Sequence, residues 1–148
     1  CQATLVDKDT LFTDSDIVSV HVRLSDRTKG LVGARELGLM KPDSYLVNIS
    51  RGPIIDEQAL LDVLRRHAIA GAALDTFDVE PMPQGHPFLG LSNTLITPHI
   101  GYVTEEGYRA GYGGVIENIR AYVSGEPIRV INPEVLESPQ LRKPIDLQ

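Results

Sequence analysis

The sequence contains almost no cysteine, no tryptophan and no long apolar run. Among its 148 residues the single cysteine is Cys1. One cysteine excludes an internal disulfide and any metal site built from several thiolates. No stretch approaches the roughly 20 apolar residues that cross a membrane, and the first thirty residues lack the basic and then apolar plan of a signal peptide. These absences predict a cytoplasmic protein that is neither secreted nor embedded in a membrane.

Charge and histidine spacing exclude two further classes of partner. The formal net charge is -6, and the 14 lysines and arginines are scattered along the chain. A nucleic-acid partner is therefore not expected, because phosphate backbones are bound by clustered cations. The four histidines, His21, His67, His86 and His99, lack the spacing of metal ligands, so no metal site is predicted. With 42% hydrophobic residues the chain can form a core and bind a small molecule.

Apolar patterning predicts alternating strands and helices. β-branched and apolar runs predict strands at 17–22, 45–49, 70–74 and 94–96. Apolar residues at helical spacing predict a helix from about Asp56, its N-cap, to His67, and a longer one over 104–124 that stops at Gly125. A weak helical turn is expected at 36–40, a turn at 13–16, a short strand at 128–131 and an irregular tail from Asn132. Three glycines inside the long helix, at 111, 113 and 114, predict either very close packing or a bend there.

This order of elements predicts an α/β fold with a parallel sheet. Parallel strands joined by crossovers form doubly wound sheets, and four strands make about half of one. The strand at 17–22 should then have an exposed edge, which proteins normally avoid. We therefore expect either a further N-terminal part of the protein or a second copy of the chain to cover that edge.

Three polar residues follow three of the predicted strands: Arg51, Glu80 and His99. Ligands of open α/β sheets bind outside the carboxyl ends of the strands, so these three side chains should converge on one crevice. A guanidinium can grip a carboxylate, and a paired imidazole and carboxylate can move a proton onto a carbonyl oxygen. The loop from Glu80 to Ser92 is too long for a simple connector and is a candidate functional loop. The pattern predicts an enzyme acting on an anionic carbonyl compound.

Four linked motifs carry a family resemblance. The segments V-N-I-S-R-G-P-I-I-D-E-Q-A-L, A-G-A-A-L-D-T-F-D-V-E-P, H-P-F and N-T-L-I-T-P-H-I-G resemble, in order and spacing, the D-isomer-specific 2-hydroxyacid dehydrogenases. The resemblance covers about residues 14–132. It implies NAD(P)-dependent hydride transfer between a 2-hydroxy acid and its 2-keto acid, with NAD favoured, in a homodimer. Residues 1–102 would be the C-terminal half of a Rossmann-type dinucleotide-binding domain. Residues 103–148 would be a long helix and short tail returning toward a substrate domain.

The resemblance also implies roles for individual residues. Arg51 would clamp the substrate carboxylate, His99 would be the general acid and base, and Glu80 would orient and charge the histidine. Asp75 would contact the nicotinamide carboxamide. The remaining cofactor contacts would come from the cofactor-facing sides of Arg51 and His99 and from wall positions at the strand ends. The wall positions are His21, Val22, Ile49, Ser50 and Gly101.

Two departures from the family pattern matter. The family commonly has a proline two residues after the histidine that ends the first strand, but here Arg23 stands there, which alters the cofactor wall or admits an extra phosphate. There is also no G-x-G-x-x-G turn; the run Gly111 to Ile116 lacks its last glycine and falls in a predicted helix. The chain alone is therefore expected to bind dinucleotide weakly or not at all, and to be inactive by itself. The residue that separates NAD from NADP and the identity of the acid are not visible.

Two rival functions fit some of the same residues. Ser50, Asp75 and His99 occur in the order of an α/β-hydrolase triad, although the G-x-S-x-G elbow is missing and Arg51 would crowd the oxyanion site. A cofactor-sensing binding module without turnover, like the co-repressors related to this family, also matches the sequence. The joint presence of Arg51, Glu80 and His99 favours catalysis.

Overall fold

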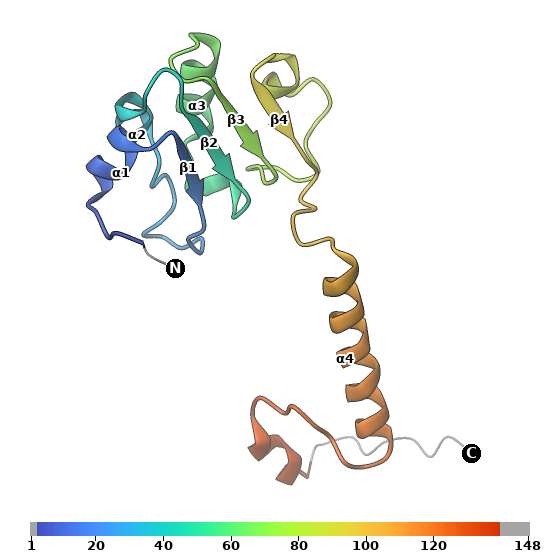
Figure 1. The fold of residues 1–148 in the computed structure, drawn as a ribbon. Coiled ribbons are helices and arrows are strands. Elements are labelled where there is room, and N and C mark those ends of the chain that lie inside the picture. Colours follow the sequence, from blue (N-terminus) through green and yellow to red (C-terminus); the bar gives the residue numbers. More distant parts are fainter. Residues whose placement is uncertain (1–2, 140–148) are drawn as a thin grey trace. The chain divides into compact units, whose positions relative to one another are not determined.

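The computed structural model describes residues 3–139, and contacts within the chain divide it into two units. The first unit ends at Gly101 and the second begins at Tyr102. The first unit contains a parallel sheet of four strands in the order β1-β2-β3-β4 (Figure 1). The predicted α/β fold with a parallel sheet is thus confirmed. β1 pairs only with β2, so it is the edge strand that the sequence predicts.

The four strands end in register. The structure has β1 at Ile17–Val20, β2 at Tyr45–Asn48, β3 at Gly71–Leu74 and β4 at Thr94–Ile96. Each lies within its predicted range. Their last residues pair in a row: Val20 with Asn48, Asn48 with Leu74, and Leu74 with Ile96. The chain therefore leaves all four strands along one edge of the sheet.

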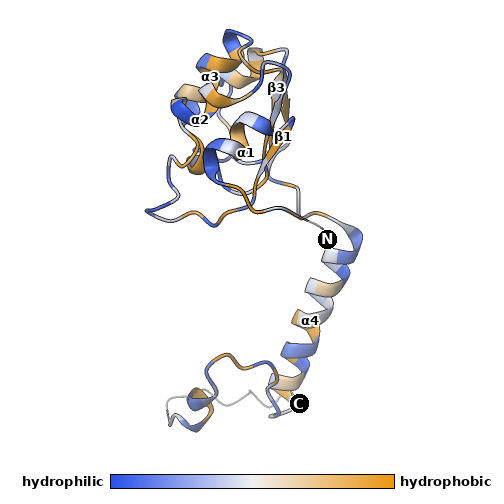
Figure 2. Ribbon diagram, turned by 60° about the vertical axis from the view of Figure 1, so that its left-hand side comes forward, coloured by the Kyte–Doolittle hydropathy of each residue, from blue (hydrophilic) through white to orange (hydrophobic). Residues whose placement is uncertain are grey.

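Three helices cover one face of this sheet: α1 (Lys8–Asp14), α2 (Ala34–Leu39) and α3 (Glu57–Arg65) (Figure 2). Val18, Leu46 and Leu74 are buried beneath them, whereas Ile17 and Leu95 are 63% and 67% exposed. Since adjacent residues of a strand point to opposite faces, the second face is apolar and largely uncovered within the described residues. This matches the expectation of half of a doubly wound sheet.

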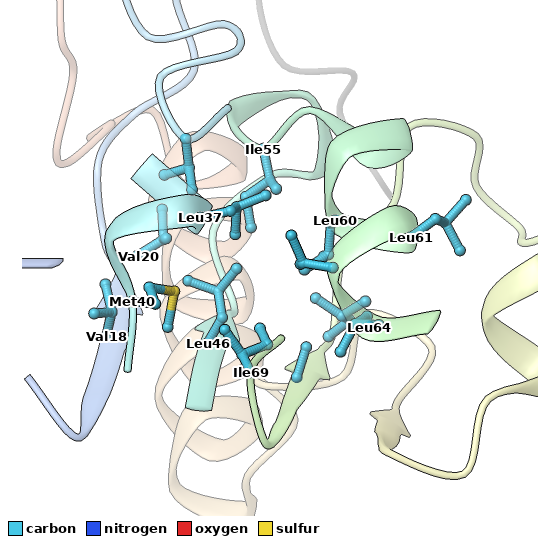
Figure 3. Packing of buried hydrophobic residues seen from close by; sticks show 14 of the residues in the cluster. Val18, Val20, Leu37, Met40, Leu46, Ile55, Leu60, Leu61, Leu64 and Ile69 are labelled. Atoms are coloured by element: carbon cyan, nitrogen blue, oxygen red, sulfur yellow. The ribbon is translucent and has the colours of Figure 1, made fainter. Parts of the chain in front are cut away.

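The core forms where α2 and α3 meet the sheet. Leu37, Leu46, Leu60, Leu64 and Ile69 are almost completely buried and pack together (Figure 3). Each stabilises the fold by about 1.5–3 kcal/mol through removal of apolar surface from water. Helix α3 begins as predicted, because the carboxylate of its N-cap residue accepts a hydrogen bond from the N–H of Ala59 at 3.0 Å.

Helix α1 replaces part of the predicted turn at 13–16. Its N-cap Asp7 accepts a hydrogen bond from the N–H of Thr10, and Phe12 is buried in the core. The helix has 7 residues and a single buried side chain. Such a short segment shows no apolar repeat, which explains why the sequence pattern missed it.

The second unit contains α4 (Glu105–Val123), capped by Thr104 and followed by Gly125 at φ +83°, as predicted. A Cβ atom added at Gly111, Gly113 or Gly114 would meet nothing within 4 Å among the described residues. The close packing considered for these glycines is therefore not found there. No helix within residues 3–139 combines the length and the apolar character that a membrane crossing requires.

The predicted strand at 128–131 is wrong. Arg129 has φ +54°, in the left-handed region that strands exclude, and its guanidinium pairs with Glu117 at 2.6 Å. This ion pair turns the segment back along α4 in place of an extended run. The tail predicted as irregular contains a 3₁₀ helix at Pro133–Glu137, and the rest of that prediction, from residue 140, lies outside the described residues.

Glu36 should link stability to pH. Burial alone would raise its pKa, but hydrogen bonds from Lys8 and from the N–H of Gly33 lower the pKa to about 2. A lowered pKa stabilises the fold above about pH 4.5, and this contribution is lost as the pH falls through 2. We expect Glu36→Gln to lower the free energy of unfolding at pH 7 by about 1–2 kcal/mol.

Urea unfolding at several pH values measures this effect. The difference between Glu36→Gln and the native chain should shrink as the pH falls from 4.5 toward 2. Asp26→Asn is the matched control, since Asp26 is exposed. An equal loss of stability in both variants, or a difference independent of pH, would contradict the assignment.

Candidate active site

The turn after β2 is held from within by Asn48. This side chain is buried; its amide Nδ2 donates to the carbonyl of Arg51 at 2.9 Å, and its Oδ1 accepts from the N–H of Ser50 at 3.0 Å. Buried amides of this kind fix a backbone conformation because both of their polar ends need partners. Arg51 is thereby placed at the carboxyl edge of the sheet, where its Nη1 donates to the carbonyl of Ser50.

Gly52 brings the segment after β2 against the segment after β3. A Cβ atom at Gly52 would lie 2.1 Å from the carbonyl carbon of Phe77 and 2.5 Å from the backbone nitrogen of Asp78. No side chain fits into such a backbone contact. Because Glu80 lies three residues beyond Phe77, this contact sets the spacing between Arg51 and Glu80.

Glu80 and His99 form a hydrogen-bonded pair. One carboxylate oxygen of Glu80 accepts from the N–H of Phe77 at 2.9 Å, and the other is 2.7 Å from Nδ1 of His99. Both side chains are 34% exposed, so the pair faces the solvent at the rim of the unit. The pKa of Glu80 lies below its usual value, first because of the hydrogen bond with His99 and then through the N–H of Phe77 and the charges of His99 and Arg51. Arg51, Glu80 and His99 thus interact electrostatically.

Asp75 anchors the loop that carries His99. Its carboxylate accepts hydrogen bonds from the hydroxyl of Thr97 and from the N–H groups of Ile100 at 2.9 Å and Gly101 at 2.8 Å. Burial alone would raise the pKa of Asp75, but these three donors lower it. Between them His99 adopts φ +56°, a strained conformation for a histidine that the flanking bonds hold in place. Both carboxylate oxygens of Asp75 therefore accept hydrogen bonds from within the chain.

Four of the five predicted wall positions follow β1 and β2, and the fifth, Gly101, lies beyond β4. Val22 and Ile49 are apolar but substantially exposed. The hydroxyl of Ser50 donates to the carbonyl of Val22 at 2.5 Å and ties the two strand ends together. Nε2 of His21 is 2.8 Å from the hydroxyl of Ser19, so this ring turns back toward its own strand.

A cavity of about 620 Å³ adjoins the Glu80–His99 pair. The long loop predicted to be functional forms much of its wall, and Ile96 at the end of β4 and Pro98 beyond it contribute further apolar surface. Besides Glu80 and His99, the lining residues are Phe77, Pro81, Met82, Pro83, Gln84, Leu89, Ile96 and Pro98. A largely apolar cavity with one charged pair at its side is typical of a site for a small organic molecule.

Some residues of the site were not singled out from the sequence. Asn48, Gly52 and Thr97 position the residues that the sequence predicts. Asn48 had a visible signal, since it is a polar residue within the apolar run of β2. Gly52 and Thr97 had none, because their roles depend on contacts with residues far along the chain. Within residues 3–139, no group of three histidine, cysteine, aspartate or glutamate side chains could hold a metal ion.

Comparison with known proteins identifies the family. The family model for the D-isomer specific 2-hydroxyacid dehydrogenase, NAD binding domain, matches residues 1–101. The chain belongs to this family. The match spans the whole sheet and all the polar residues that cluster at its carboxyl edge, which confirms the resemblance seen in the motifs.

Individual dehydrogenases agree with this assignment. A glyoxylate reductase of Thermofilum pendens is 41% identical over 138 residues, which is 93% of this chain and 41% of that protein. A D-isomer specific 2-hydroxyacid dehydrogenase from Lactobacillus delbrueckii ssp. bulgaricus, in its NAD complexed form, has a TM-score of 0.74 and 30% identity, covering 85% of this chain and 42% of that one.

A second solved 2-hydroxyacid dehydrogenase, from Xanthobacter autotrophicus Py2 in complex with NADPH and MES, has a TM-score of 0.66 and 37% identity; the match covers 82% of this chain and 50% of that one. These structures confirm the Rossmann-type fold class. The chain spans about two fifths of the length of the curated relatives it matches.

The Gly52 contact yields a stability prediction. Gly52→Ala should lower the free energy of unfolding by about 3 kcal/mol or more, because the methyl group must push two backbone segments apart. Gly38→Ala is the control: Gly38 lies inside α2 and an added Cβ meets nothing within 4 Å, so it should be neutral or stabilising by up to about 1 kcal/mol. Thermal unfolding of both variants measures the contrast; equal stability would show that the backbone contact is not required.

Proposed function

We propose that this chain supplies the acid–base pair and the carboxylate clamp of an NAD(P)-dependent dehydrogenase that interconverts 2-hydroxy and 2-keto acids. The observation that carries this proposal is the 2.7 Å contact between Nδ1 of His99 and Glu80, within the electrostatic reach of Arg51. The enzyme class agrees with the family to which the chain belongs. This chain spans 41% of the length of its glyoxylate reductase relative, so the activity of the whole protein is part of the proposal.

In this proposal each side chain has one task. With Nδ1 of His99 bonded to Glu80, the proton given to the keto oxygen during reduction, or taken from the hydroxyl during oxidation, passes through Nε2. Glu80 fixes the ring plane and stabilises the imidazolium. Arg51 binds the substrate carboxylate and polarises the carbonyl beside it. Asp75 keeps His99 in position through the backbone of residues 100 and 101.

The strand ends fit a nicotinamide cofactor. When bound, the nicotinamide supplies or accepts the hydride at the carbon next to the carboxylate. Val22 and Ile49 are exposed apolar side chains at neighbouring strand ends, and they suit the face of a flat ring. NAD is favoured over NADP from the family description, although one solved relative is a complex with NADPH. Asp75 would contact the carboxamide with the same carboxylate that accepts hydrogen bonds from Thr97, Ile100 and Gly101.

The substrate is proposed from the relatives, and only as a chemical class. Relatives of this chain are named for the reduction of glyoxylate and hydroxypyruvate, which are small 2-keto acids. The cavity beside the acid–base pair would admit such molecules and larger ones. We further propose a homodimer in the cytoplasm, in keeping with the uncovered face and edge of the sheet.

The contacts do not favour the rival hydrolase. The hydroxyl of Ser50 donates to the carbonyl of Val22, and the carboxylate on Nδ1 of His99 is Glu80 instead of Asp75. A serine triad needs its carboxylate on that nitrogen. The cofactor-sensing module shares the binding residues with the dehydrogenase, but a hydrogen-bonded glutamate–histidine pair beside an arginine favours turnover.

Glu80 should control the catalytic rate through His99. In Glu80→Gln the ring loses the carboxylate that holds its Nδ1 at 2.7 Å, so the rate of 2-keto acid reduction should drop roughly 100-fold. Steady-state rates of 2-keto acid reduction between pH 5 and 9, on the whole protein, measure this loss.

The control uses a second glutamate–histidine pair in the same chain. Glu57 lies 3.3 Å from Nε2 of His86, away from the acid–base pair. Glu57→Gln should leave the rate unchanged. If both variants, or neither, lost rate, Glu80 would not be the partner that positions His99.

Arg51 and Ser50 separate the dehydrogenase from the hydrolase. Arg51→Ala should lower kcat/KM for 2-keto acid reduction by roughly 1000-fold, because the carboxylate loses its bidentate partner and the carbonyl its polarisation. Ser50→Ala should retain most of the activity. Nicotinamide absorbance with and without a 2-keto acid reports the rates, and ester hydrolysis that depends on Ser50 would reverse the assignment.

A further inference from the structure

Basic side chains without a carboxylate partner gather on the loop after β1. Among the described residues, Arg23, Arg27 and Lys29 take part in no ion pair and no hydrogen bond through their side chains, and all three are exposed. Most other cations of the first unit are within 4.0 Å of a carboxylate: Lys8, Arg35, Lys41 and Arg65. The loop thus holds unneutralised positive charge in a chain whose net charge is -6.

This loop, residues 23–29, is fastened beside the segment that carries Arg51. At its beginning the carbonyl of Val22 accepts from the hydroxyl of Ser50, and just past its end the N–H of Gly30 donates to the carbonyl of Pro53 at 2.9 Å. Inside the loop, the hydroxyl of Thr28 donates to the carbonyl of Arg23 at 2.7 Å. The loop is therefore an ordered neighbour of residues 50–53 at the carboxyl edge of the sheet.

We propose that residues 23–29 form an anion subsite that binds a phosphate group of the ligand held at this edge. The proposal rests on the proposed function in taking the carboxyl edge as the ligand-binding edge. Arg51 suffices for the carboxylate of a keto acid, so three more cations, offset only by Asp26 on the loop, match a ligand of higher negative charge. Arginine is especially suited to phosphate because its planar donors bind two oxygens at once.

The phosphate group bound by the loop could belong to one of three kinds of ligand group. They are the pyrophosphate common to both dinucleotides, the 2′-phosphate of the phosphorylated dinucleotide, and the phosphate of a phosphorylated 2-hydroxy acid. Arg23 follows directly on Val22, one of the two apolar positions proposed to face the ring, so its exposed side chain begins beside the proposed cofactor site. The subsite would supply part of the phosphate binding that a glycine-rich turn provides in other dinucleotide-binding proteins.

Titration of the 148-residue chain with inorganic pyrophosphate tests the subsite. Amide chemical shifts of residues 22–30 and 50–53 should move during the titration, and the affinity should fall as salt is added. In the double variant Arg23→Ser/Arg27→Ser the dissociation constant should rise about tenfold, the loss expected for charge-assisted hydrogen bonds at an exposed site. Shifts confined to other regions, or an unchanged dissociation constant in the double variant, would overturn the proposal.

Arg66→Ser is the matched control. Within residues 3–139 Arg66 also has no carboxylate partner, but it follows α3 and precedes β3, so it lies toward the amino end of the strands. Its loss should leave pyrophosphate binding unchanged, and an equal weakening would show that only overall charge matters. If the double variant did not fold, Lys29→Ser would provide the same comparison with a single exposed substitution.

Further ligands identify the source of the phosphate. ADP-ribose, its 2′-phosphorylated form, and 3-phosphoglycerate set against glycerate are titrated into the native chain and the double variant. Weakening of ADP-ribose assigns the cofactor pyrophosphate; weakening of only the 2′-phosphorylated form or only 3-phosphoglycerate assigns the other sources. Equal affinities for every ligand in both proteins would refute the subsite. Because no turnover is measured, this result is independent of the rate profile of Glu80.

Discussion

The backbone contact between Gly52 and Phe77 is the constraint on which the site depends. It closes two loops from neighbouring strands onto each other without any intervening side chain. On one side of the contact lies Arg51, and on the other the N–H of Phe77 holds Glu80 toward His99. The sheet supplies the register of the strand ends, but this contact converts an edge of scattered polar groups into one charged cluster. Precise placement of such groups is what lowers a reaction barrier.

The fold and the acting residues were largely visible in the sequence, whereas their supports were not. β-branched runs and helical spacing predicted β1 to β4, α3 and α4, because these elements bury or repeat apolar residues over several turns. Arg51, Glu80 and His99 were visible as polar residues just after apolar runs. Helix α1 is too short to show a repeat, and the segment around Arg129 is turned by an ion pair with Glu117 that no local pattern reveals.

Two electrostatic devices operate side by side at the carboxyl edge. The first is the Glu80–His99 pair, in which a carboxylate with a lowered pKa is hydrogen-bonded to an imidazole. The carboxylate can stabilise a positive charge on the ring. The second is an excess of positive charge, in Arg51 and in the loop that follows β1. Because the chain carries an overall negative charge, these local cations make the carboxyl edge more favourable for an anion than the rest of its surface.

The left-handed backbone of His99 has a consequence for how this position can be replaced. At φ +56° a β-branched residue would clash with its own carbonyl, so a valine or threonine there would displace the loop as well as remove the imidazole. Asparagine tolerates this conformation best among the polar residues. It is the replacement that removes the imidazole while keeping the chain path, and hence the one that separates the role of the ring from that of the backbone conformation at this position.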